Sequence, residues 1–278
     1  MKMKHGKKVI LLGLALAVSV SSLSLAAEST ASTDTNHSRM SIHKGKDKGL
    51  NLELGYFKPE LTFKSRYTKN NTAVADINFK DELGMGDKNA TDYRLHISDN
   101  LRLAYTSFGY DGHRTISKSI TYGGSTYNAG VDVKFDFDID YYRLTWYRPI
   151  TKTPALKTGW LIDIKGFNIK TGLFGMTSAG TSQGVSKNFK GVIPTIGFSA
   201  DARISENVSA YAEVSGLPLG KYGHFYDGEI GLKYNPTPNS KVFVSYRSFD
   251  LDIKDGDENG DRAKLKLSGP FMGMSYNF

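Results

Sequence analysis

Residues 192–215 read VIPTIGFSADARISENVSAYAEVS, and the alternation in this stretch decides the fold class. From Val192 to Ile204 the even-numbered side chains are apolar, while most odd-numbered ones are small or polar. After Glu206 and Asn207 the same alternation resumes at Val208. A period of two residues indicates a β-strand, and a short polar break between two such runs indicates a hairpin.

The same texture continues from residue 49 to the C-terminus, with no change in composition that would mark a second domain. The expected strands span about 49–67, 91–98, 100–121, 131–149, 158–175, 191–205, 207–217, 224–235, 241–254 and 262–278. A mean hydropathy of −0.37 argues against a bundle of transmembrane helices, and the absence of cysteine excludes disulfides and thiolate metal sites. We therefore predict an all-β protein, an antiparallel up-and-down transmembrane β-barrel of ten strands, or alternatively eight, with a polar lumen.

The N-terminus predicts export. Residues 1–27 have the layout of a signal peptide: lysines at 2, 4, 7 and 8, an apolar run over 9–20, and small residues before position 28. Residues 28–48 are polar and predict a flexible tail, so the barrel domain is expected at 49–278. Without the four lysines, 32 basic residues face 28 acidic ones, a net charge of +4 that does not suggest a nucleic-acid partner.

The connections between the expected strands alternate in length. One set is short, as at 98–100, 151–157, 206–207 and 235–240, and the other is longer, as at 68–90, 122–130, 176–190, 218–223 and 255–261. Short turns at one end and longer loops at the other are typical of outer-membrane barrels. An even number of strands would also bring both termini to the short-turn end.

The two faces of the expected strands differ in chemistry. An aromatic girdle facing lipid is predicted at Tyr56, Trp146, Tyr147, Trp160, Tyr234, Tyr276 and Phe278. The opposite face would place in the lumen Glu53, Arg94, Arg102, Asp140, Arg143, Asp163, Lys165, Asp201, Arg203, Glu213, Glu229, Lys233 and Arg247. A soluble core could not hold these thirteen charges, whereas a narrow lumen can if they pair. Seven bases against six acids favour a structural network over an ion-selective pore.

The strand at 131–149 changes phase midway. Phe137, Ile139 and Tyr141 give way to Tyr142, Leu144 and Trp146, as a β-bulge or a passage between two environments would produce. About 19 residues at ~3.3 Å each, tilted ~45°, rise roughly 44 Å, which exceeds an apolar band of ~25 Å. The alternating acids Asp132, Asp136, Asp138 and Asp140 are therefore also candidates for solvation above a membrane.

Residues 76–84 (DINFKDELG) follow the first expected strand and resemble a segment at the same place in a family of small Gram-negative outer-membrane β-barrel proteins. The stretches 100–105 (NLRLAY) and 120–130 (ITYGGSTYNAG) and the ending 269–278 (GPFMGMSYNF) resemble it as well. The resemblance implies the fold, outer-membrane location and recognition of the C-terminal Phe by the barrel-assembly machinery, but no reaction and no ligand.

Three segments could carry more than structure. Residues 76–84 predict a short helix, either a plug whose acids pair with lumen arginines or a helix on the barrel rim. Residues 255–261 (DGDENGD) match the first half of a calcium loop, but the twelfth position is Lys266, so a solvated loop is favoured over a weak calcium or lipopolysaccharide-bridging site. For a rim protease of the omptin type, the candidates are Asp111 and His113 with Asp138 and Asp140, and for a lipid A-modifying enzyme His224.

None of these candidates meets the requirements of a site, so no catalytic, cofactor-binding or metal-ligating residue is predicted, and no cofactor. We predict an integral outer-membrane protein, not an enzyme, with a structural, surface or narrow-pore role. The alternatives are a rim-located outer-membrane enzyme and a secreted soluble β-barrel that binds a ligand. Outer-membrane lipid, lipopolysaccharide and the assembly machinery are the expected partners, and the oligomeric state is left open.

Overall fold

The computed structural model describes residues 50–69, 72–122, 125–176, 180–254 and 261–278. The expected signal peptide and tail lie outside these residues, as do positions 255–260 of the calcium-like loop. No helix among the described residues is long and apolar enough to cross a membrane.

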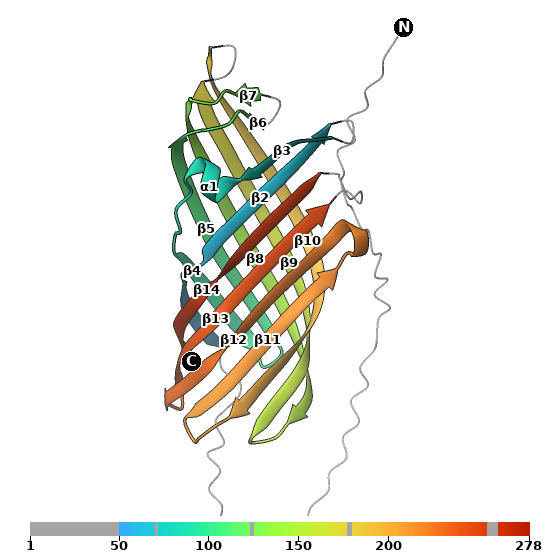
Figure 1. Ribbon diagram of the computed structural model, residues 1–278. Coiled ribbons are helices and arrows are strands. Elements are labelled where there is room, and N and C mark those ends of the chain that lie inside the picture. The colour runs from blue at the N-terminus through green and yellow to red at the C-terminus, as the bar shows by residue number, and fades with distance from the viewer. Residues whose placement is uncertain (1–49, 70–71, 123–124, 177–179, 255–260) are drawn as a thin grey trace, which may run out of the picture. The chain divides into compact units, whose positions relative to one another are not determined.

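The described residues form a closed antiparallel barrel of ten strands (Figure 1). Its wall runs β1 (Asn51–Phe57), β4 (Ala90–Ser98), β5 (Leu101–Thr115), β8 (Asp132–Lys152), β9 (Leu156–Met176), β10 (Ser182–Arg203), β11 (Val208–Pro218), β12 (Gly223–Thr237), β13 (Ser240–Lys254) and β14 (Arg262–Asn277). Pairing of β1 with β14 from Asn51↔Asn277 to Phe57↔Phe271 closes the barrel. The ten-strand prediction is confirmed, and the eight-strand alternative is wrong.

The first expected strand is broken. After β1 the chain leaves strand geometry at Lys58 and Pro59, and β2 (Glu60–Lys69) then pairs with the N-terminal half of β14. The interruption falls at a proline, which has no backbone N–H to give to a ladder. A hairpin follows, in which β2 pairs with β3 (Thr72–Asn78).

A short helix follows the β2–β3 hairpin. Helix α1 (Phe79–Leu83) ends at Gly84, whose φ of 67° is a left-handed conformation that favours glycine. Figure 1 shows α1 between β2 and β5, where β4 no longer covers the edge of β5. The helix fits closely there, because a Cβ at Gly112 of β5 would lie 2.4 Å from the carbonyl oxygen of Leu83.

The remaining elements lie at the loop end. A small hairpin of β6 (Ile120–Tyr122) and β7 (Ser125–Tyr127) forms a sheet of its own, and a 3-10 turn, η1 (Gly220–Tyr222), precedes β12. The strand expected over 100–121 therefore ends at Thr115. The loop expected at 176–190 was also wrong in part, since Ser182 to Lys190 already belong to β10 and pair with β9.

The phase change in residues 131–149 is not a bulge. β8 keeps an unbroken register with β5 from Leu101↔Trp146 to Thr115↔Asp132, and with β9 from Val133 to Pro149. What changes is the face that carries the apolar side chains. Phe135, Phe137 and Ile139 are buried inside, whereas Tyr142 and Trp146 are exposed outside.

This switch divides the barrel into two parts, which we call the turn half, next to the short turns, and the loop half. In the turn half the outer wall is apolar. Its exposed side chains include Leu52, Leu54, Leu103, Leu144, Trp146, Trp160, Ile162, Ile196, Phe198, Val214, Ile230, Leu232, Tyr234, Val244, Met272, Met274, Tyr276 and Phe278. A continuous apolar band of this size would cause aggregation in water, so it fits a bilayer and not a soluble barrel.

Six of the seven girdle aromatics face outward as predicted, at positions near the short turns or further up the same outer wall. Tyr147 is the exception, because it lines the mouth of the lumen. The sequence places Tyr147 directly after Trp146, so alternation alone puts the two rings on opposite faces of β8.

Candidate functional site

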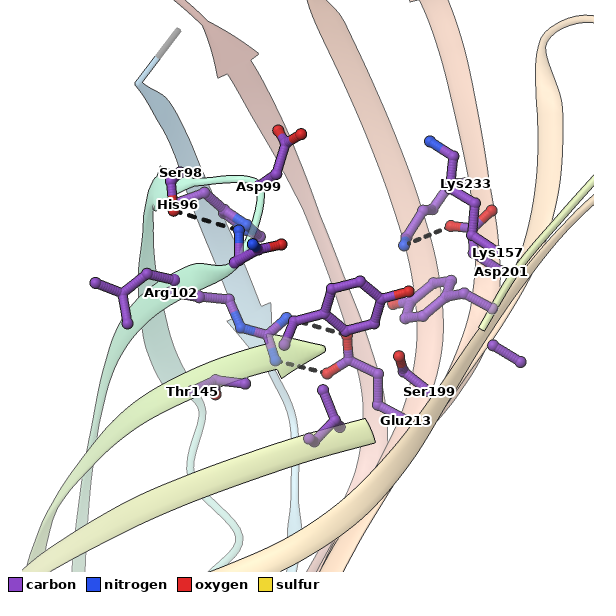
Figure 2. Close-up of a pocket in the computed structure, with 16 residues that line it drawn as sticks. His96, Ser98, Asp99, Arg102, Thr145, Lys157, Ser199, Asp201, Glu213 and Lys233 are labelled. Carbon is purple, nitrogen blue, oxygen red and sulfur yellow. Dashed lines mark hydrogen bonds and ion pairs between the residues drawn. The ribbon is translucent and has the colours of Figure 1, made fainter. Parts of the chain in front are cut away.

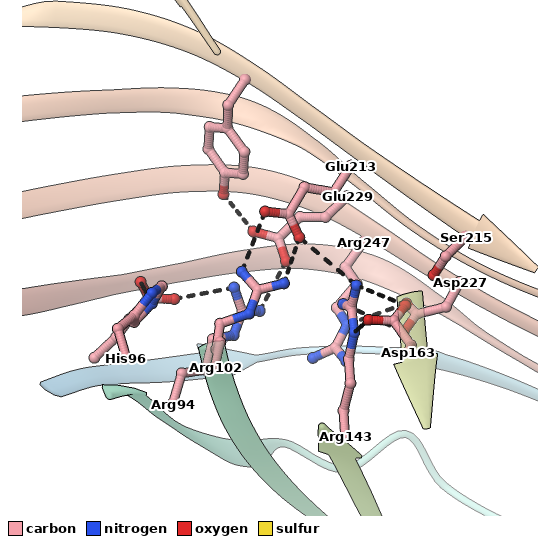
Figure 3. Close-up of polar contacts among 12 residues, drawn as sticks. Arg94, His96, Arg102, Arg143, Asp163, Glu213, Ser215, Asp227, Glu229 and Arg247 are labelled. Atoms are coloured by element: carbon pink, nitrogen blue, oxygen red, sulfur yellow. Dashed lines mark hydrogen bonds and ion pairs between the residues drawn. The ribbon is translucent and has the colours of Figure 1, made fainter. Parts of the chain in front are cut away.

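The interior of the turn half is filled by ionised side chains (Figure 3). Arg94 of β4 holds three carboxylates: its Nε lies 2.6 Å from Asp92, and its Nη atoms lie 2.7 Å from Glu229 and 2.9 Å from Glu53. Arg247 of β13 reaches the second oxygen of Asp92 at 2.8 Å. The strands place these groups together because each side chain occupies an inward position of its strand.

A second group surrounds Asp227 of β12. Lys165 lies 3.3 Å from this carboxylate and donates a hydrogen bond to Ser215 at 2.7 Å. The hydroxyl of Tyr141 donates to Asp227 at 2.7 Å. Arg143 pairs with Asp163 through two hydrogen bonds of 3.1 Å and lies 3.7 Å from Asp227.

The centre of this arrangement is fully removed from solvent. The side chains of Asp92, Asp163 and Lys165 are each 0% exposed. An unpaired ion at such depth would cost several kcal/mol, so the arrangement depends on every charge having partners. The arrangement holds five bases and six acids, which are Arg94, Arg102, Arg143, Lys165 and Arg247 with Glu53, Asp92, Asp163, Glu213, Asp227 and Glu229. We call these eleven side chains the charged network.

Toward the short turns the network opens into a small vestibule (Figure 2). Its cavity measures about 180 Å³ and is lined by residues of the turn after β4 and by inward side chains of several strands. Arg102 binds Glu213 there with hydrogen bonds of 3.1 and 2.6 Å, and Lys233 lies 3.0 Å from Asp201. These pairs bound the vestibule, which lies at the short-turn end of the charged network.

In the loop half the interior is apolar instead. Phe79 of α1 stacks on Phe63 at 4.2 Å, Phe63 stacks on Phe137 at 4.7 Å, and Phe79 lies 4.9 Å from Phe135. Nearer the charged network, Tyr141, Phe167, Phe225 and Phe249 form a second set of ring contacts of 5.0 to 5.7 Å. We call these eight rings the aromatic core.

The segment at 76–84 therefore contributes to closing the barrel, but not in the way its acids suggested. Phe79 and Leu83 are buried in the loop half. Glu82 pairs with Lys118 at 2.8 Å and Asp81 accepts a hydrogen bond from Asn78, so neither acid reaches a lumen arginine. Of the two alternatives for this segment, the plug whose acids pair with lumen arginines is wrong, because α1 lies in the loop half, away from the charged network.

Most of the predicted lumen charges lie inside, and two do not. Asp140 faces outward on β8, where it accepts hydrogen bonds from Tyr105 and Asn168 at 3.0 and 3.1 Å, and Arg203 is exposed at the end of β10. Asp92 and Asp227 are central to the charged network but were missed. Each lies two positions before a predicted lumen residue, Arg94 and Glu229, so extending the alternation by one step would have found them.

The residues considered for an omptin-like site are not assembled. Asp111, His113, Asp138 and Asp140 all lie on the outer wall of β5 and β8, not in the lumen, and Asp111 pairs with Lys88. His224 also faces outward, with its Nε2 3.5 Å from Asp250. No cluster of three potential metal ligands occurs among the residues that the structure describes. That the chain is not an enzyme stays a prediction.

No family model and no curated protein matches the sequence. Among solved structures, the outer-membrane protease OmpT from Escherichia coli aligns with a TM-score of 0.53 at 12% identity, over 86% of this chain and 99% of that one. This chain has the fold of an outer-membrane β-barrel. At that identity the likeness concerns the fold and not the activity.

Other outer-membrane barrels align with lower scores. The attachment invasion locus protein Ail of Yersinia pestis aligns at a TM-score of 0.30 and 12% identity, over 83% of this chain and 99% of that one. The toluene transporter TodX of Pseudomonas putida aligns at 0.36 and 10% identity, over 83% and 90%.

Proposed function

We propose that this protein is an integral outer-membrane β-barrel with a sealed interior, which acts as a rigid, non-conducting support for its loop half at the cell surface. The observation that carries the proposal is the double filling of the lumen. The charged network blocks the turn half, and the aromatic core blocks the loop half behind it.

The two fillings act in series. Ions would have to cross a layer in which Asp163 and Lys165 are fully buried, and then a layer of stacked rings in which Phe135 and Phe137 are 0% exposed. A water path must pass both, so opening either one alone leaves the barrel closed. This supports a scaffold or surface role over the narrow-pore role that the charged lumen also suggested.

Planar-bilayer recording tests the proposal. The refolded protein is expected to give no stepwise conductance at any applied voltage. A variant with Arg102→Ala and Glu213→Ala removes the charged-network pair nearest the mouth, whose side chains are 11% and 18% exposed, and widens the vestibule, while the buried Asp163 and Lys165 and the aromatic core stay in place. We expect this variant to remain silent too.

A pore would behave differently, because widening its narrow mouth would raise the current. Reproducible conductance steps from the wild-type protein would overturn the proposal, as would steps that grow in the double variant. Heat-modifiable migration on a gel provides the folding control for both proteins, since it reports the closed barrel independently of current.

A further inference from the structure

The outer wall of β14 and β2 carries a row of basic side chains in the loop half. Lys264 of β14 stands directly opposite Lys64 of β2 in the antiparallel register, and Lys266 follows on the same face, opposite Thr62. We call Lys64, Lys264 and Lys266 the lysine cluster. Like charges directly opposite each other on one face of a sheet are destabilising, so the protein maintains this arrangement at a cost.

The acids nearby form no ion pair with the cluster. Asp252, opposite Lys264 on the other side of β14, is held by Arg262 with hydrogen bonds of 2.8 and 2.5 Å. Asp250, opposite Lys266, lies 3.5 Å from His224. Among the residues that the structure describes, no ion pair joins a lysine of the cluster to a carboxylate. Three positive charges are therefore available to an anion from outside.

The height of the cluster matches a lipid head group. Along β14 the outward side chains below it are Met272 and Met274, which belong to the apolar band, and Tyr246 lies across from Pro270. Lys266 is four residues beyond Pro270, so it lies about 13 Å further along the strand, or roughly 9 Å higher at a tilt of ~45°. Phosphate groups of a membrane lie just outside the hydrocarbon, at such a level.

The positive charge is local. On the outer wall of β5 and β8 the loop half carries acids at Asp111, Asp136, Asp138 and Asp140, interrupted by Lys134. The rim is therefore not basic all round. Lys134 and Lys170 are comparably exposed lysines that lie among acidic residues.

We propose that the lysine cluster binds the phosphate groups of a phosphorylated glycolipid of the outer leaflet, the lipid A part of lipopolysaccharide, whose acyl chains lie on the apolar wall formed by Leu54, Met272 and Met274. The proposal rests on the outer-membrane location that the proposed function assumes. Compact ammonium groups on flexible stems suit phosphate as point charges, without a rigid geometry.

The test is titration of the refolded, detergent-solubilised protein with bis-phosphorylated lipid A, read out as an apparent Kd. Each lysine near a charged lipid surface is worth roughly fivefold in affinity, so Lys64→Gln, Lys264→Gln and Lys266→Gln together should weaken binding roughly a hundredfold. The matched control, Lys134→Gln with Lys170→Gln, should bind as the wild type does. Dephosphorylated lipid A should bind the wild type as weakly as the triple variant binds the phosphorylated form.

Inorganic phosphate at equal concentration should not displace the lipid, because it lacks the acyl chains. The proposal is overturned by a triple variant that binds like wild type, by an equal loss in the control, by dephosphorylated lipid A that binds as tightly, or by displacement with free phosphate. A failure of lipid binding would not change the absence of conductance in the bilayer recordings. The sealed barrel and the lipid A site can therefore be disproved separately. Removing the cross-strand repulsion should not harm folding, and heat-modifiable migration checks this.

Discussion

The turn half and the loop half of this barrel are built from the same strands but sort their side chains in opposite ways. In the turn half, apolar groups such as Ile230 and Val244 face outward and ions fill the interior. In the loop half, Phe135 and Phe137 fill the interior, while Asp136 and Asp138 face outward. One strand can satisfy both patterns because its two faces simply exchange roles at the membrane boundary.

The difference separates two sources of stability. The loop half is stabilised as a soluble protein is, by withdrawing rings from water. The outer wall of the turn half faces lipid, so the hydrophobic effect does not stabilise it. Its stability must come from the pairing of its charges and from the closed hydrogen-bond ladder. Substitutions inside the two halves should therefore destabilise the protein in different ways.

The largest effect is expected from Asp227→Ala in the charged network. The substitution leaves Lys165, Arg143 and Arg247 buried with one carboxylate fewer, and should lower the free energy of unfolding by about 3–5 kcal/mol. Urea unfolding in lipid vesicles, followed through the two tryptophans, measures this change. Asp138→Ala, on the exposed outer wall, is the control and should stay within about 0.5 kcal/mol of wild type. Equal losses in both variants would contradict the two-part description.

A smaller and more local loss is expected from Phe137→Ala in the aromatic core. Truncating a fully buried phenyl ring should cost about 3 kcal/mol, confined to the loop half because the membrane-embedded ladder remains intact. Hydrogen exchange should show faster opening of the upper parts of β5 and β8 with unchanged protection near Trp146. A uniform loss of protection along β8 would mean that the halves unfold as one unit.

The smallest effect concerns the link between β2 and the segment after α1. Partial burial disfavours the charged form of Asp87, but the Lys80 ammonium at 2.8 and 3.0 Å and the backbone N–H of Leu61 at 3.3 Å outweigh it, so the pKa of this carboxyl is lowered. A lowered pKa stabilises the folded form above the ordinary aspartate pKa, and this contribution disappears as the pH falls through the folded value.

Exchange of the Leu61 amide should therefore accelerate below about pH 4 once corrected for intrinsic rates. Asp87→Asn should remove that acid-induced step and leave the remaining amides of β2 unaffected. A step that persists in this variant would assign the titration to another group.

Sequence patterns sufficed for the barrel and for most of the charged network, because both follow from the alternation of side chains along strands. They did not suffice where pairing partners matter. The extension of β10 over Ser182–Lys190 contains Gly184, Lys187 and Asn188, which read as a loop, and only the ladder with β9 makes it a strand. The position of α1 could not be predicted either, since nothing in the local sequence indicates where in the barrel Phe79 packs.

The reversal of faces along β8 also limits how the barrel can sit in its membrane. If the barrel moved toward the cell interior by two residues, the Asp140 carboxylate would approach the hydrocarbon. If it moved outward by the same amount, Tyr142 and Leu144 would be exposed to water. Both displacements cost free energy, so the sequence of β8 fixes how deep the barrel lies in the bilayer. The same sequence therefore also sets how far the loops extend beyond the lipid.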